Sequence, residues 1–260
     1  MNAGISSAGP IDGGTAPARA AGVAVVSDVH GNAVALEAVL AEVRSEAPDM
    51  VVFGGDLTWG PMPRETLDLV AELDVPAVFV RGNAERSLLE SQDEPSERAR
   101  WMRRQHTLDD LAFLATFVEN VAFDIAGLGP TRFCHGSPRS DEELVTPRTP
   151  EVRIREMTAS ISEGVLVTAH THLQFDRPVA GIRSVNAGSV GMPYEDRRGA
   201  FWALLGPDVD FRRTEYSLDR AVEAYRATDD PLNDQMIEIL LTPPTRDEVI
   251  EHAERLEFSG

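Results

Sequence analysis

Short apolar runs alternate, in the first third of the chain, with segments in which apolar residues recur every three or four positions. Apolar runs occupy residues 23–26, 50–53 and 77–80, and the segments 33–46 and 64–73 between them have the spacing of amphipathic helices. Each run leads into glycine and a polar residue. This repeated order predicts parallel strands joined by right-handed helical crossovers.

The pattern changes after residue 90. A charged segment at 91–104 and an apolar one at 108–118 predict one or two helices that cover the sheet. Two short runs separated by the sequence GLGP predict a hairpin. The other expected elements are strands at 121–125, 131–134, 165–167, 182–185, 200–205 and 209–213 and helices at 151–160, 218–227, 232–241 and 246–256.

Composition defines the expected domain organisation. Residues 1–20 are rich in Ala, Gly, Ser and Pro without periodicity, as in a flexible tail. We expect residues 21–216 to form one α/β domain. Residues 217–260 are expected to form a helical extension that packs on the same domain.

Charge and cysteine content exclude several classes of protein. The formal net charge is -19, from 43 acidic against 24 basic residues, and every basic residue is arginine. This charge disfavours binding to duplex nucleic acid or an anionic membrane. The single cysteine, Cys134, excludes an intrachain disulfide and a cysteine-based zinc cluster, and we expect it to be a buried core thiol.

The expected compartment is the cytoplasm. No run approaches the ~18 apolar residues that a membrane helix requires, and no charged segment followed by an apolar one marks a signal peptide at the N-terminus. One cysteine in 260 residues is also consistent with a reducing environment. Formation of a homo-oligomer is left open.

Side chains able to bind a cation follow the predicted strands. Asp28 and His30 are two positions apart, so in an extended chain they project to the same side and could contact one cation together. Ligands of parallel sheets bind beyond the carboxyl ends of the strands. One such residue alone is more often structural than a ligand. In this chain seven such residues each follow an apolar run and lie near glycine or another small residue. They are Asp28, His30, Asp56, Asn83, His135, His170 and His172.

The segments that carry these residues read SDVHGN, GGD, RGN, FCHGSP, AHTH and NAGSVG. In this order they resemble the D-x-H, G-D, G-N, H and G-H-x-H blocks of the calcineurin-like metallophosphoesterase superfamily, and most of all its small bacterial and archaeal branch. The resemblance spans residues 27–191. It implies an α/β fold, a four-layer αββα sandwich, with two bound metal ions.

The resemblance also implies a role for each of the seven residues. Asp56 would bridge the two metals, and Asp56 and Asn83 are the expected catalytic residues. The implied ligand sets are Asp28, His30 and His172 for the first metal and Asn83, His135 and His170 for the second.

The chemistry of this ligand set has a physical rationale. Two cations about 3.5–4 Å apart repel each other, so a shared carboxylate is needed between them, and their joint field lowers the pKa of a bridging water. The resulting hydroxide could attack phosphorus in line. Nitrogen and oxygen ligands without thiolate suit divalent transition metals. We expect Mn first, with Fe, Zn, Ni or Co as alternatives.

Two positions depart from the family pattern. Many relatives have histidine after the G-N pair, where it assists the leaving group or binds phosphate, but this chain has Ala84. Without that acid, alkyl phosphomonoesters should be poor substrates, whereas activated aryl esters or phosphodiesters should react better. Ala169 replaces the usual glycine before H-x-H, with little expected effect. Arg86 and Asn32 are candidate phosphate-binding residues, although Arg86 could equally form a surface salt bridge.

The leading hypothesis is therefore a dinuclear metal-dependent phosphoesterase that hydrolyses a small phosphodiester or nucleotide. A non-catalytic metal-binding scaffold of the same fold is the alternative from another class, and the absence of histidine at Ala84 is its motive. Complete ligand sets argue against it. Phosphomonoesterases, protein phosphatases and diadenosine polyphosphate hydrolases are narrower alternatives, which the same absence disfavours.

Overall fold

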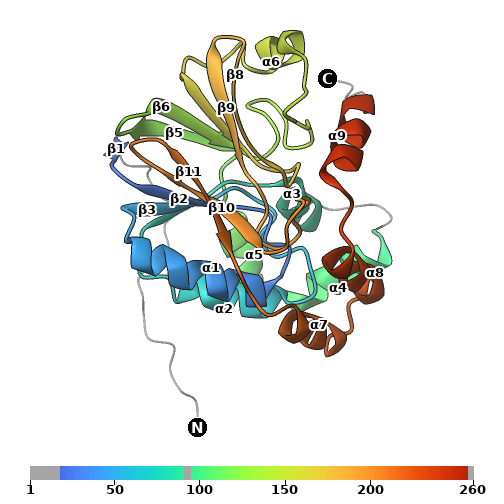
Figure 1. Ribbon diagram of the computed structural model, residues 1–260. Coiled ribbons are helices and arrows are strands. Elements are labelled where there is room, and N and C mark those ends of the chain that lie inside the picture. Colours follow the sequence, from blue (N-terminus) through green and yellow to red (C-terminus); the bar gives the residue numbers. More distant parts are fainter. Residues whose placement is uncertain (1–17, 91–94, 257–260) are drawn as a thin grey trace.

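The computed structural model describes residues 18–90 and 95–256 (Figure 1). Most of the expected N-terminal tail, residues 1–17, lies outside the described part. Its end contains a strand that was not expected, β1 (Arg19–Ala20), which pairs in parallel with β5 (Asn120–Ile125). The second sheet therefore includes Arg19 and Ala20, which were expected to belong to the tail.

The first sheet contains the predicted β-α repeats. Strands β2 (Val23–Val26), β3 (Met50–Phe53) and β4 (Ala77–Phe79) are parallel neighbours, as expected. Every residue of β2 and β3 is buried, which explains their uninterrupted apolar runs. The connecting helices are α1 (Ala33–Glu46) and α2 (Pro63–Ala71). The sheet has the order β11-β10-β2-β3-β4 and is completed by the antiparallel strands β10 (Ala200–Leu205) and β11 (Val209–Thr214).

The second sheet is mixed and has the order β1-β5-β6-β7-β9-β8. Strand β8 (Gln174–Val179) was not predicted, because its apolar residues are few and Pro178 lies within it. Proline is tolerated there since β8 is an edge strand. Cys134, at the end of β6, is buried as predicted, and burial raises the pKa of its thiol. The other strands are β6 (Gly129–Cys134), β7 (Val165–Thr168) and β9 (Ile182–Ala187).

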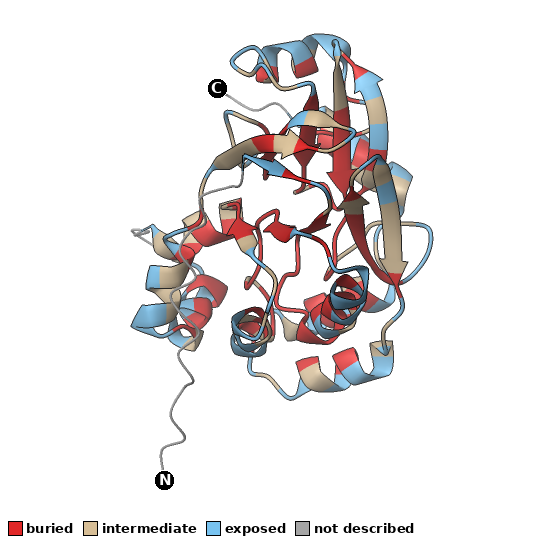
Figure 2. Cartoon of the chain, turned by 90° about the vertical axis from the view of Figure 1, so that its left-hand side faces the viewer, coloured by how far each residue is buried: buried red, intermediate tan, exposed pale blue. Residues whose placement is uncertain are grey.

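Apolar cores separate the layers of this sandwich. Side chains such as Val25, Val52 and Phe133 form the core between the two sheets. Leu36 and Leu40 of α1 belong to a second core beneath the first sheet. Figure 2 shows buried positions concentrated on the strands and on the inward faces of the helices. A smaller core packs α6 (Glu151–Met157) against the outer face of the second sheet, which completes the predicted αββα order.

The remaining helices lie around the carboxyl ends of the strands and below the first sheet (Figure 1). The apolar segment 108–118 is helical only as far as Leu114, because Val118 leaves the helix to form a bridge with Val80. The three C-terminal helices form within two residues of their predicted ends. The remaining helices of the fold are α3 (Asn83–Leu89), α4 (Glu97–Gln105) and α5 (Leu108–Leu114), followed by the C-terminal helices α7 (Leu218–Arg226), α8 (Asn233–Leu241) and α9 (Arg246–Arg255).

An apolar cluster attaches α7 and α8 to helix α1. Tyr225 of α7 and Met236 of α8 are buried together with Val34 of α1. None of the described helices combines the length and apolar character that a bilayer-spanning segment needs.

Candidate metal centre

The two sheets bring all seven predicted residues to one edge of the sandwich. Asp28 and His30 follow β2, Asp56 follows β3, and Asn83 is the first residue of α3 after β4. The second sheet supplies the remaining histidines after β6 and β7, namely His135, His170 and His172.

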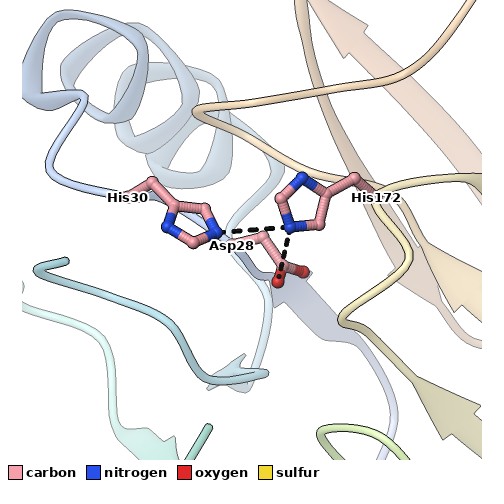
Figure 3. Close-up of side chains that lie close together, drawn as sticks. All are labelled: Asp28, His30 and His172. Atoms are coloured by element: carbon pink, nitrogen blue, oxygen red, sulfur yellow. Dashed lines mark hydrogen bonds and ion pairs between the residues drawn. The ribbon is translucent and has the colours of Figure 1, made fainter. Parts of the chain in front are cut away.

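The first group of possible ligands contains Asp28, His30 and His172, all of them buried (Figure 3). The Nε2 atom of His172 lies 3.2 Å from Asp28 Oδ1 and 3.2 Å from His30 Nε2. The oxygen Asp28 Oδ1 is buried and accepts no hydrogen bond. Three atoms with lone pairs therefore converge on one point.

The second group contains Asp56, His135 and His170. His135 Nε2 lies 3.2 Å from His170 Nδ1 and 3.0 Å from the side-chain oxygen of Asn83. The amide of Asn83 therefore points to the same place as the two imidazoles, as the sequence predicted for a fourth member.

Asp56 lies between the two groups. Its Oδ2 atom is 3.6 Å from His30 Nε2, and its Oδ1 atom is 3.5 Å from His135 Nε2. One carboxylate thus directs an oxygen toward each group. This is the arrangement that a bridging ligand of two neighbouring cations requires.

Backbone carbonyls fix the orientation of three of the rings. The Nδ1 atoms of His30, His135 and His172 lie 3.2, 2.8 and 2.7 Å from the carbonyl oxygens of Trp59, Gly54 and Met192. A carbonyl oxygen can only accept, so Nδ1 carries the proton and Nε2 of the neutral ring presents a lone pair. Such outer hydrogen bonds hold metal-ligating histidines in position.

The backbone at the site is strained. Asp28, His30, Asp56, His170 and His172 have positive φ values of 51°, 47°, 52°, 65° and 59°. This left-handed region is unfavourable for residues other than glycine. Five of the seven described non-glycine residues with positive φ are thus candidate ligands. Strain of this kind persists where the surrounding structure holds a functional geometry.

The charges of the group favour a cation. Burial would raise the pKa of Asp28, but the histidines around it, His172 first, hold that pKa below its ordinary value. Burial would lower the pKa of His135 and His172, but the carboxylates Asp56 and Asp28 raise both. Burial, together with the charge of His135, lowers the pKa of His170 to about 4. The carboxylates therefore attract positive charge into a buried site, which a metal ion would supply.

The residues fit two divalent metal ions. In the first group, Asp28 Oδ1 lies together with His30 Nε2 and His172 Nε2 and is buried without a hydrogen-bond partner, which is unfavourable for a carboxylate oxygen unless a cation lies beside it. The two groups contain nitrogen and oxygen donors and no thiolate. This donor set suits transition metals such as Mn, Fe, Co, Ni or Zn.

The two predicted phosphate-binding residues have other partners. The side-chain oxygen of Asn32 accepts a hydrogen bond from Ala35 N at 3.1 Å and caps α1. Its amide nitrogen lies 3.3 Å from the carbonyl oxygen of Gly191, and Asn32 is fully buried. Arg86 Nε donates to Asp141 at 2.7 Å, and another of its nitrogens donates to Glu142. Arg86 therefore forms the salt bridges that were the alternative to a phosphate-binding role.

Glu85 supports the site and was not identified from the sequence. It is buried and accepts hydrogen bonds from the backbone N–H groups of Asp56, Leu57 and Gly82 at 2.8–3.0 Å. Burial, and then the charge of Asp56, raises the pKa of Glu85 to about 7. Its place two residues after Asn83, beside the segment that resembles the G-N block, was the available signal.

Comparisons with known proteins show similarity over most of the chain. A family model described as a calcineurin-like phosphoesterase superfamily domain matches residues 22–205. The uncharacterized protein MJ0912 of Methanocaldococcus jannaschii is 25% identical over 232 residues, which cover 77% of this chain and 90% of that protein.

Two solved structures have a similar fold. A metallophosphoesterase from Sphaerobacter thermophilus matches with a TM-score of 0.68 and 26% identity, over 86% of this chain and 99% of the other. The hypothetical protein PH1004 from Pyrococcus horikoshii OT3 matches with a TM-score of 0.74 and 19% identity, over 87% of this chain and 99% of the other. The second similarity shows the fold alone.

Proposed function

Because the chain belongs to the calcineurin-like phosphoesterase superfamily, we propose that it is a dinuclear metal-dependent hydrolase of a small phosphodiester. The observation that carries this proposal is the position of Asp56, whose two oxygens lie 3.6 and 3.5 Å from the nitrogens of His30 and His135 in separate groups.

The proposed ligand sets follow the two groups. Asp28, His30 and His172 would hold one metal, Asn83, His135 and His170 the other, and Asp56 both. Two divalent ions, with Mn as the first choice, would activate water for attack on phosphorus and neutralise charge on the phosphoryl oxygens. The buried carbonyl-bound imidazoles would keep this geometry unchanged during turnover.

The substrate class follows from what the site lacks. Ala84 offers no proton donor at the position where many relatives have histidine. Aryl esters need a proton on their leaving group less than alkyl esters do, so activated diesters are the preferred substrates. The net charge of -19 disfavours a polyanionic substrate such as duplex nucleic acid.

The experiment that tests this proposal is metal depletion and refilling. Protein treated with chelator should lose hydrolysis of bis(p-nitrophenyl) phosphate, and Mn should restore it as the metal content approaches two ions per chain. Failure of Mn, Co, Ni and Zn alike to support hydrolysis would reject the proposal. Full activity with one bound ion would reject the dinuclear mechanism.

A further inference from the structure

A cleft of about 360 Å³ connects the metal centre with the C-terminal helices. His30, Asp56 and Asn83 form one part of its lining. Helix α8 and the residue before it contribute another part, with side chains at 232, 235, 236 and 239, the spacing of a single helix face. This helix lies after residue 205, where the family match ends. The candidate metal centre is thus bordered by a segment that the family match does not include.

Helix α8 is held at the cleft by specific contacts. Arg98 of α4 donates to Asp230 at 2.8 Å, and both side chains are at most 10% exposed. Trp101 Nε1 donates to Asp229 at 2.8 Å. Asp230 also accepts a hydrogen bond from Leu232 N at 2.9 Å, at the entrance to α8. The position of the helix is therefore determined by buried polar contacts in addition to apolar packing.

The lining near α8 is mainly apolar. We define the apolar wall as Trp59, Met192, Leu232, Met236 and Ile239, all of which line the cleft. Leu232 is 38% exposed, so a large apolar side chain faces an open space there. Trp59 and Met192 also supply the carbonyl oxygens that orient His30 and His172, so the wall adjoins the metal ligands directly.

The wall has the composition of a site for an uncharged planar group. Arg98 also lines the cleft, and its ion pair with Asp230 neutralises the positive charge of its guanidinium. Aromatic rings pack favourably on tryptophan and on the thioether of methionine. Clefts of about 300–1,000 Å³ lined by apolar residues are typical of small-molecule sites.

We propose that the apolar wall binds an aryl or nucleobase substituent of the phosphodiester, and so selects diesters with one planar group over dialkyl diesters. This inference rests on the proposed function, because the metal centre must hold the phosphate for the substituent to reach the wall. It also agrees with the lack of a proton donor at Ala84, since aryl leaving groups depart without one.

Binding of two phosphinates to the Mn-loaded protein tests the inference. Diphenylphosphinate and dimethylphosphinate carry the same anionic group, and their P–C bonds cannot be hydrolysed. Calorimetry should give a Kd for the diphenyl compound that is about tenfold lower or more, as burial of one ring predicts. Equal affinities of the wild-type protein for the two compounds would overturn the inference.

Two leucines of the same helix region give a matched control. Leu232 and Leu241 are each 38% exposed, but only Leu232 lines the cleft. The double variant Leu232→Ala/Ile239→Ala should reduce the affinity ratio to below about threefold, whereas Leu241→Ala should leave it unchanged. A similar loss in both variants, or in neither, would count against the wall. Should the double variant not fold, the wild-type ratio and Leu232→Ala still decide.

Hydrolysis assays separate this inference from the proposed function. Methyl p-nitrophenyl phosphate and bis(p-nitrophenyl) phosphate have the same leaving group. Because each ester carries a planar group, activity on both with kcat/KM values that Leu232→Ala leaves unchanged would leave the proposed function intact and reject the wall. Absence of activity on either ester with every metal would instead reject the proposed function.

Discussion

The metal centre and the apolar wall border the same cleft but are built differently. Ligands such as Asp28 and His172 are buried, have positive φ values and follow strands of the two sheets. Wall residues such as Leu232 and Ile239 belong to a C-terminal helical segment and are partly exposed. On the proposed function, the sheet edge would hold the metal ions, while the attached helices would select what the substrate carries beyond its phosphate.

This difference predicts different consequences of substitution. At the sheet edge the candidate ligands are held by several neighbours. Asp28, for example, contacts both Ser27 Oγ, at 2.7 Å, and His172 Nε2, at 3.2 Å. The position of α8 depends on apolar packing and on a few contacts between α4 and the residues that precede α8. Changes at the sheet edge should therefore abolish turnover, and changes around α8 should alter selectivity or stability with metal binding retained.

The largest effect is expected at Asp56. Asp56→Asn removes the negative charge that would bind both cations, so kcat should fall by about 10³-fold or more, measured with bis(p-nitrophenyl) phosphate. The bound metal should fall below two ions per chain by elemental analysis. The exposed Asp68 provides a control, since Asp68→Asn lies on α2 away from the ligands. Unchanged turnover in Asp56→Asn would contradict the bridging role.

The next effect is expected at the attachment of α8. Asp230→Ala leaves the buried Arg98 without its 2.8 Å partner and removes the acceptor for Leu232 N. The free energy of unfolding should fall by about 3 kcal/mol in urea titrations, while the folded variant should still bind two metal ions.

A double variant controls for the unpaired charge. Arg98→Met/Asp230→Asn removes both charges and keeps an acceptor for Leu232 N, so it should lie within about 1 kcal/mol of wild type. Loss of metal from the folded Asp230→Ala variant would show that the metal centre and the wall are not independent.

A smaller effect on stability is expected at Glu85. Its two oxygens accept three backbone N–H groups, so in Glu85→Gln the new amide faces at least one of these donors. The unfolding free energy of the metal-free protein should fall by about 2 kcal/mol. Glu90→Gln, an exposed change in the same helix region, should shift it by less than about 0.5 kcal/mol. Equal shifts in the two variants would mean that Glu85 does not support the loop before Leu57.

The contrast between the two regions also explains what could be predicted from the sequence. Asp28, Asp56 and Asn83 follow the predicted parallel strands, so the strand pattern places them together at the carboxyl ends of one sheet. The histidines that follow strands of the second sheet were assigned to the same site by the family resemblance. The apolar wall could not be found in this way. Leu232 and Ile239 have the pattern of any amphipathic helix, and only tertiary packing decides which face meets the cleft.

Support residues were missed for a related reason. Glu85 carries out its role through hydrogen bonds to the backbone of another loop, and such partners leave no periodic signal. Strand β8 was missed because Pro178 interrupts the usual strand composition, which is acceptable only at the sheet edge it occupies. The contacts of Arg86 depended on the loop that contains Asp141, whose position no local pattern defines.

The smallest change, and the one that joins the two regions, is expected at Ala84. This residue is buried, lines the cleft beside Asn83, and its N–H donates to Asp56 Oδ1 at 3.0 Å. A histidine there would extend into the cleft and could protonate an alkoxide as it leaves. Ala84→His should therefore raise kcat/KM for an alkyl phosphomonoester by about tenfold, less than the usual ~10²–10⁴-fold of a general acid because the site has not been shaped around it. Activity on bis(p-nitrophenyl) phosphate should change little, since p-nitrophenolate needs no proton.

The variant Ala84→Leu is the control, because leucine fills the same space without an ionisable group. It separates the effect of a proton donor from the effect of the shape of the cleft. If leucine also raised the ratio of monoester to diester hydrolysis, selectivity would be due to the shape of the cleft instead of the missing acid.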